Sequence, residues 1–89
     1  MAVKLTPEVL QDDLAVSVAR AMATANNRAR ELGVNVLESI ITITQQTTND
    51  SGIWRINYGP RDYVNRRGGD LIVEVNSAEA TIIKVLHGQ

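Results

Sequence analysis

The amino-acid sequence predicts an α+β fold in which one long N-terminal helix packs on one face of a four-stranded antiparallel meander sheet. Alanine is concentrated before residue 33, whereas the β-branched residues are concentrated after it, which separates a helical third from a β-rich remainder. The connections between the first two and between the last two β-rich runs are short. Short connections favour antiparallel pairing, because a parallel pair needs a crossover of about a dozen residues. The length of 89 residues suffices for one domain, residues 1–89.

The predicted helix spans residues 7–32. Thr6 can cap its first N–H groups, and Pro7 suits the first helical position because no N–H is needed there. Gly33 follows as a residue that readily adopts the left-handed conformation in which helices end. Apolar residues recur in between at intervals of three and four, which is typical of one buried helix face: Leu10, Leu14, Val18, Ala21, Ala25, Ala29 and Leu32.

Four runs alternate as β-strands do: residues 37–45, 53–58, 70–76 and 80–87. In the last run an inward Ile82 would turn Lys84 inward as well, and burying an unpaired lysine is costly. We therefore assign Ile83 and Val85 to the face beneath the helix. Turn-forming residues separate the first two runs and make a short hairpin loop at 76–79. The other residues expected beneath the helix are Leu37, Ile41, Ile43, Trp54, Ile56, Tyr58, Leu71, Val73 and Val75.

The composition argues against several classes of partner. Nine basic and ten acidic residues give a net charge of −1, so the field of the whole chain opposes polyanions and disfavours nucleic acid. No apolar run approaches the about 18 residues that a membrane span requires. The N-terminus lacks the apolar block of a signal peptide. We therefore expect a cytoplasmic protein with no membrane partner.

No catalytic residue, metal site or cofactor is expected. The chain has no cysteine and a single histidine, His87, whereas a transition-metal site needs three or four converging ligands. As a general base, His87 would need an orienting partner and a pocket. The sequence contains no recognisable nucleophile motif or phosphate-binding loop. These observations favour a protein that is not an enzyme.

The face of the sheet that the helix leaves uncovered is the first candidate binding surface. One helix covers one face, and nothing else in the chain remains for the other. A contiguous apolar patch on such a face more often marks an interface than a bare surface. The sequence therefore predicts a homodimer, or another protein, seated on four aliphatic residues: Ile40, Ile72, Ile82 and Leu86.

The long connection at residues 59–69 is the second candidate surface, since loops of this length are commonly functional. Residues 53–69 hold four arginines against one aspartate, a local charge of +3. Arginine binds carboxylates and phosphates through planar paired donors. An acidic protein surface, single-stranded RNA stacked on tyrosine, and a plain solvated loop all remain open. The candidate partner-binding residues are Arg55, Arg61, Tyr63, Arg66 and Arg67.

Three short segments carry a resemblance to known families: Trp54-Arg55-Ile56, Val73-Glu74-Val75-Asn76 and Ile82-Ile83-Lys84-Val85. They resemble the aromatic-x-aliphatic strand and the V-x-V-D hairpin of PepSY (peptidase-propeptide) domains and the wider cystatin-like group. Ala80 stands about where those hairpins usually carry glycine. The stretch 68–89 also looks like small immunity proteins of nuclear-transport-factor-like fold. Both groups are chiefly binding or inhibitory modules, so the resemblance implies recognition of a partner.

The sequence therefore predicts a protein-binding or inhibitory module that acts through the arginine-rich loop and the open sheet face. The main alternative is a small-ligand binder or enzyme that uses the concavity between helix and sheet, lined by Trp54 and Tyr58. A weak nucleic-acid binder is a further alternative.

Overall fold

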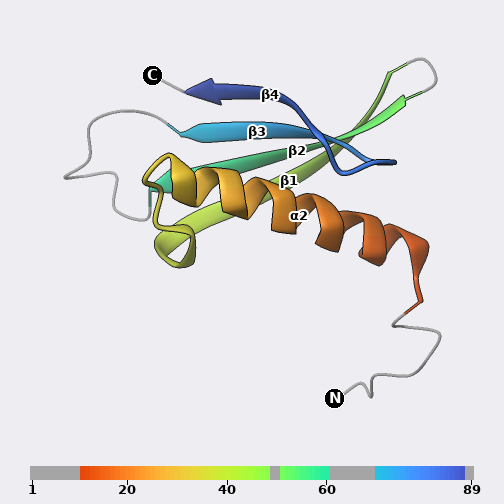
Figure 1. Ribbon diagram of the computed structural model, residues 1–89, viewed down its shortest axis with the longest axis horizontal. Helices are drawn as coiled ribbons and strands as arrows, with labels where there is room; N and C mark the ends of the chain where they lie inside the picture. The colour runs from red at the N-terminus through yellow and green to blue at the C-terminus, as the bar shows by residue number, and fades with distance from the viewer. Residues whose placement is uncertain (1–10, 49–50, 61–69, 88–89) are drawn as a thin grey trace.

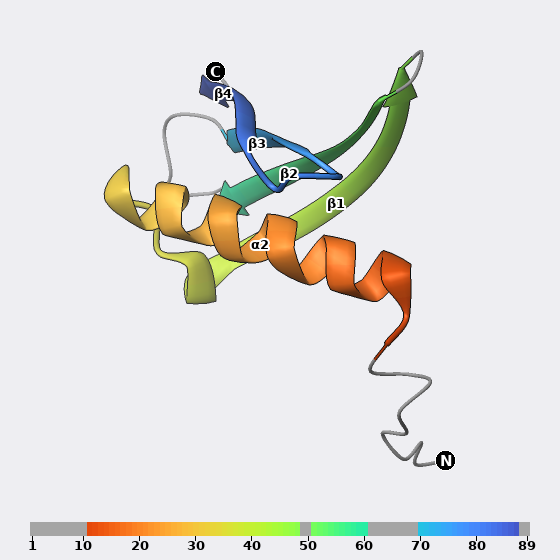
Figure 2. The ribbon, with the colours of Figure 1, turned by 45° about the vertical axis from the view of Figure 1, so that its right-hand side comes forward.

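The computed structural model describes residues 11–48, 51–60 and 70–87 of the chain. These residues form one α-helix, a short 3-10 helix and four strands: α2 (Asp13–Glu31), η1 (Val36–Glu38), β1 (Ser39–Thr48), β2 (Ser51–Pro60), β3 (Leu71–Asn76) and β4 (Ile82–His87). The strands form one antiparallel sheet in the order β1-β2-β3-β4. Figures 1 and 2 show α2 along one side of this sheet. The predicted helix-on-meander architecture is confirmed.

Helix α2 begins later than the sequence suggested. Asp12 has extended backbone angles and its side-chain oxygen accepts a hydrogen bond from the Ala15 amide at 2.8 Å. An N-cap of this kind satisfies one of the unpaired N–H groups at a helix start. A continuous helix over residues 7–32 is therefore wrong, and Thr6 and Pro7 lie outside the described residues. At the other end Gly33 has a φ of +86°, as predicted for a helix stop.

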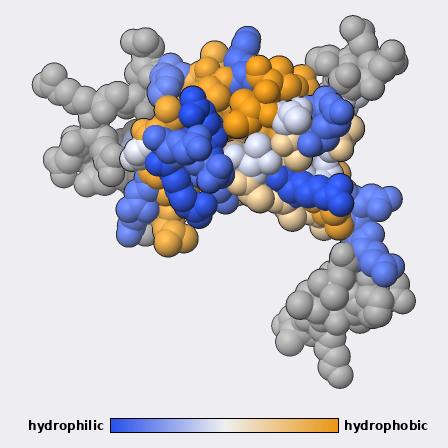
Figure 3. Space-filling view, viewed as in Figure 1, coloured by the Kyte–Doolittle hydropathy of each residue, from blue (hydrophilic) through white to orange (hydrophobic). Residues whose placement is uncertain are grey.

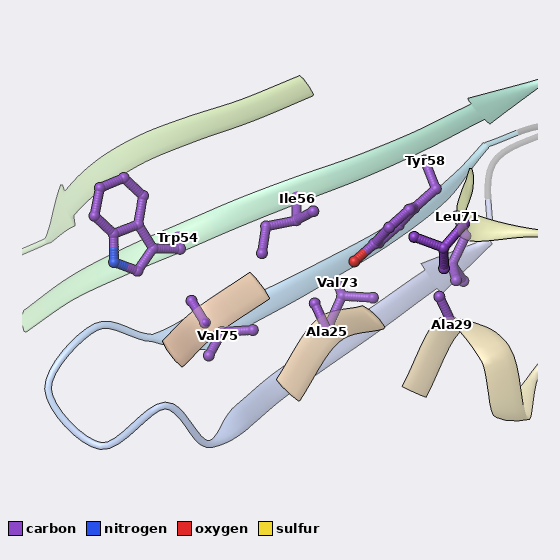
Figure 4. Packing of buried hydrophobic residues seen from close by; sticks show 10 residues of the cluster. Ala25, Ala29, Trp54, Ile56, Tyr58, Leu71, Val73 and Val75 are labelled. Carbon is purple, nitrogen blue, oxygen red and sulfur yellow. The ribbon is translucent and has the colours of Figure 1, made fainter. Parts of the chain in front are cut away.

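The helix lies close to the sheet because its contact face consists of small residues. Ala21, Ala25 and Ala29 are at most 1% exposed, and Figure 4 shows Ala25 and Ala29 facing the side chains of β2 and β3. Spaced four residues apart, they share one face of the helix. The buried core consists of Ala21, Ala25, Ala29, Val36, Trp54, Ile56, Tyr58, Leu71, Val73 and Val75.

The strand register confirms the predicted alternation in the central strands. Trp54 pairs with Val75, and Ile56 pairs with Val73, and all four side chains are at most 5% exposed. Ile56 also pairs with Ile43 of β1. Directly opposed residues share a face, so these side chains define the helix side of the sheet. We call the opposite side the outer face.

Two predictions for the first strand are corrected. Leu37, expected beneath the helix, lies in η1 and is 87% exposed. The 3-10 turn interrupts the alternation before β1 begins at Ser39, so Leu37 never joins the sheet. The predicted turn cluster is also narrower than expected, because β1 continues to Thr48 and β2 starts at Ser51.

The hairpin between β3 and β4 is held by hydrogen bonds to its own turn and to the helix. The Asn76 side-chain oxygen accepts from the amides of Ala78 and Glu79 at 2.8 and 2.9 Å. From α2, the Thr24 hydroxyl donates to the Ala80 carbonyl at 3.0 Å. Ala80 has a φ of +55°, a conformation that glycine adopts more readily than alanine.

Candidate functional site

Two cross-strand rows of residues define the outer face. One runs Thr42, Asn57, Ile72 and Leu86 from β1 to β4, and the next runs Thr44, Arg55, Glu74 and Lys84. The first row places the two aliphatic side chains beside each other on β3 and β4, and both are half-buried. Ile40 lies farther along β1, opposite Gly59, and is 49% exposed. Three of the four predicted aliphatic residues therefore share this face.

Ile82, the fourth aliphatic residue, does not join them. The pairing of β3 with β4 shifts register between Glu74 and Val75, and Ile82 pairs with Val75. Val75 is fully buried on the helix side, so its partner lies on that side as well. An irregularity of one residue reverses the alternation that the sequence suggested.

The charged row is internally paired. Arg55 Nη1 lies 3.9 Å from Glu74 Oε2, and Lys84 stands directly opposite Glu74 across β3 and β4. The Glu74 side chain is only 15% exposed, whereas that of Arg55 is 38% exposed. Arg55 is the one residue of the predicted arginine set that the structure describes. Arg61, Tyr63, Arg66 and Arg67 lie outside the described residues.

Asn57 lies near the centre of the outer face and has a side-chain oxygen, Oδ1, that is buried without a hydrogen-bond partner among the described residues. A buried acceptor without a donor destabilises the fold by about 1–3 kcal/mol. Thr42 and Ile72 are its cross-strand neighbours.

The space between helix and sheet is filled by side chains whose polar ends are already paired. Trp54 Nε1 donates to Ser17 Oγ at 2.8 Å, and the Tyr58 hydroxyl donates to Asn26 Oδ1 at 2.6 Å. Burial raises the pKa of the Tyr58 phenol to about 12, and the positive charge of Arg30 offsets part of that rise. The two aromatic residues expected to line a ligand cavity therefore serve as core residues.

His87 lies at the end of β4 and is exposed. Its cross-strand partner is Leu71, which cannot orient an imidazole. Within residues 11–48, 51–60 and 70–87, no group of three His, Asp or Glu side chains is placed to hold a metal ion.

A second apolar surface lies on the helix side and was not expected. Ile82 and Ile83 are 38% and 50% exposed, and Figure 3 shows an apolar patch beside the helix in the region of β4. Helix α2 packs against β2 and β3, so the outer strands keep their helix-side residues partly exposed. This exposure could have been predicted from the widths of the two layers. The outermost strands of a four-stranded sheet lie about 14 Å apart, whereas one helix is about 10 Å wide.

Comparisons with protein families, with curated proteins and with solved structures found no match. Within the described ranges, no helix combines the length and the apolar character that crossing a membrane requires.

Proposed function

We propose that this chain is a non-catalytic protein-binding module that presents the outer face of its sheet to a partner protein. The observation that carries the proposal is the one-sided cover of the sheet. Helix α2 covers the central strands on the helix side, while no element of the described chain covers the outer face, where Ile40, Ile72 and Leu86 lie. A contiguous apolar patch on an uncovered sheet face is typical of an interface, and Ile72 and Leu86 lie side by side on this face.

The charge pattern of the outer face favours a protein over a polyanion. Arg55 and Lys84 flank Glu74 in one row, so the basic groups are offset locally by a carboxylate. Phosphate backbones are bound by clusters of unpaired basic side chains. A mixed charged row beside an aliphatic pair instead suits the polar rim and apolar centre of a protein–protein contact.

The packing between helix and sheet weighs against the ligand-binding alternative. A ligand site needs a cavity with polar groups converging on it. Trp54 and Tyr58 are 5% and 2% exposed, and their polar atoms are bonded to Ser17 and Asn26. These groups are already engaged in the fold, and the resemblance to binding and inhibitory modules points the same way.

Site-specific photocrosslinking in the native host tests the proposal. A photoreactive amino acid replaces Ile72 on the outer face or, as a matched control, Ala23 on the exposed side of α2. We expect a discrete crosslinked protein from position 72 and none from position 23. The captured protein is then purified and its affinity measured by calorimetry.

The same purified partner allows a quantitative test. Ile72→Asp should weaken its binding by more than about tenfold, because an aspartate must be desolvated in the contact. Ala23→Asp should leave the affinity unchanged. Circular dichroism and Trp54 fluorescence confirm that both variants are folded. Equal capture at positions 72 and 23, or an unchanged affinity for Ile72→Asp, would contradict the proposal.

A further inference from the structure

We propose that the chain forms a two-fold symmetric dimer in which the β1 strands of two copies pair antiparallel and join two sheets into one of eight strands. This inference concerns the edge of the sheet and goes beyond the proposed function, which concerns the outer face. Both can hold together, because edge pairing extends the outer face without covering it.

The free edge of β1 is long and unprotected. It pairs with β2 along all ten residues on one side, and it ends the sheet on the other side in the part of the chain that the structure describes. The strand reads SIITITQQTT, with no charged residue and no proline. An edge strand presents unpaired N–H and C=O groups, and charge or proline normally keeps another strand from pairing with them.

The opposite edge of the same sheet carries the protection that β1 lacks. Strand β4 has only six residues, with Lys84 in its centre, and its pairing with β3 is irregular between Glu74 and Val75. Short length, a central lysine and an irregular register all discourage further pairing. The two edges therefore differ in the features that decide whether a strand is added.

The helix side of β1 also has apolar surface that a neighbouring strand would cover. Ile43 pairs with Ile56, which is fully buried, yet Ile43 itself remains 40% exposed. The helix packs against β2 and β3 and does not shield this position. A second strand beside β1 would place its own helix-side residues against Ile43.

A second copy of this chain is the occupant that fits best. With Thr42 opposite Thr42 of the second copy, Ile41 of each chain faces Ile43 of the other on the helix side. Paired residues share a face in an antiparallel ladder, so this register keeps all four isoleucines together. No charged residue lies between Ser39 and Gln45, so the identical strands meet without opposing like charges. The net charge of −1 per chain adds little repulsion.

The molecular mass in solution tests the proposal first. Light scattering coupled to size exclusion should give twice the 9.7 kDa of the chain at about 100 µM, a concentration suited to a small interface. The mass should fall toward that of the monomer on dilution. A monomer over the whole range would overturn the proposal.

Matched substitutions assign the contact to one edge. Ile43→Lys places a charge in the paired strand and should raise the dimer dissociation constant by more than about a hundredfold. Ile83→Lys makes the same change at a similarly exposed position on β4 and should leave it unchanged. A dimer that survives Ile43→Lys but is lost with Ile72→Asp would place the contact on the outer face and overturn the edge proposal while supporting the proposed function.

Disulfide trapping tests the register without depending on the stability of a charged variant. The chain has no cysteine, so Thr42→Cys introduces a single thiol. In the proposed register the two Cα atoms at position 42 lie about 4.5–5.5 Å apart, which a disulfide can bridge. We expect rapid oxidation to a covalent dimer for Thr42→Cys and not for Thr81→Cys, an exposed control ahead of β4. Equal rates for the two variants would overturn the proposal.

Discussion

Individual polar residues decide how the aromatic side chains fit into an aliphatic core. Trp54 and Tyr58 reach into the layer between helix and sheet, and Ser17 and Asn26 on α2 accept their hydrogen bonds. A buried donor without an acceptor would destabilise the fold. The helix therefore supplies two polar residues on the margins of its alanine face.

The raised pKa of Tyr58 predicts a loss of stability at alkaline pH. Its pKa in the folded protein is about 12, above the ordinary value of 10.0, so the folded state holds the phenol proton more tightly than the unfolded state does. This contribution is complete below about pH 10 and is lost as the pH rises toward 12. Urea unfolding at a series of pH values should show that the free energy of unfolding falls between about pH 10 and about pH 12. The fall should be smaller in Tyr58→Phe.

Asn26→Ala separates the hydrogen bond from the ionisation of the phenol. Both Asn26→Ala and Tyr58→Phe should lower the free energy of unfolding by about 1 kcal/mol near neutral pH, because each removes the same hydrogen bond. Asn26→Ala keeps the buried phenol of Tyr58 and its raised pKa, so its free energy of unfolding should still fall at alkaline pH. Tyr58→Phe has no phenol to ionise. If the free energy of unfolding fell as much at alkaline pH in Tyr58→Phe as in the unmodified protein, groups other than Tyr58 would be responsible.

Ala80 carries backbone strain that glycine would relieve. Its φ of +55° lies in the left-handed region, which is unfavourable for a residue with a Cβ by about 1–2 kcal/mol. Ala80→Gly should raise the free energy of unfolding by about 0.5–1 kcal/mol after the added entropy of the unfolded chain is subtracted. Thermal and urea unfolding measure the change. Ala78→Gly in the same turn should not stabilise the protein, and a stabilisation by both would assign the effect to the turn as a whole.

At the scale of elements, the alanine face sets the distance between α2 and the sheet. Ala21, Ala25 and Ala29 present only methyl groups to the buried cluster that they share with residues of β2 and β3. Small contact residues let the helix approach the sheet closely, and close-packed interiors leave little room for added volume. The helix is therefore fitted to this sheet by size as well as by polarity.

A larger side chain at the centre of this face should separate the two layers. Ala25 is fully buried, so Ala25→Leu should lower the free energy of unfolding by about 1–3 kcal/mol. Ala23→Leu lies on the exposed side of the same helix and should change stability by less than about 0.5 kcal/mol. Equal effects at the two positions would mean that helix propensity, and not packing, governs the contact. Urea unfolding followed by Trp54 fluorescence compares them.

At the scale of the whole molecule, one helix is too narrow to cover four strands. The central strands β2 and β3 carry most of the core, while Ile43 on β1 and Ile83 on β4 keep 40% and 50% of their surface exposed. The outer face has no cover in the described part of the chain. The molecule thus has an open face and an unprotected edge, and each is suited to a different contact.

The order of elements, the antiparallel meander and the buried faces of the central strands could all be predicted from the amino-acid sequence. These follow from local signals: short turns, alternating aliphatic residues in β2 and β3, and a helix face of alanines. Local periodicity is reliable there because each strand is paired on both sides and its two faces have different environments.

The ends of the elements, the register of β4 and the position of the helix over the sheet depend on tertiary contacts. The helix start depends on which residue caps it, and Asp12 does so. Leu37 was left outside the sheet by a 3-10 turn, and Ile82 was turned to the helix side by one shift of register against β3. Which strands the helix covers was also settled only by packing. Periodicity records neither a change of register nor the lateral position of a helix, because both arise from contacts between segments that lie far apart in the chain.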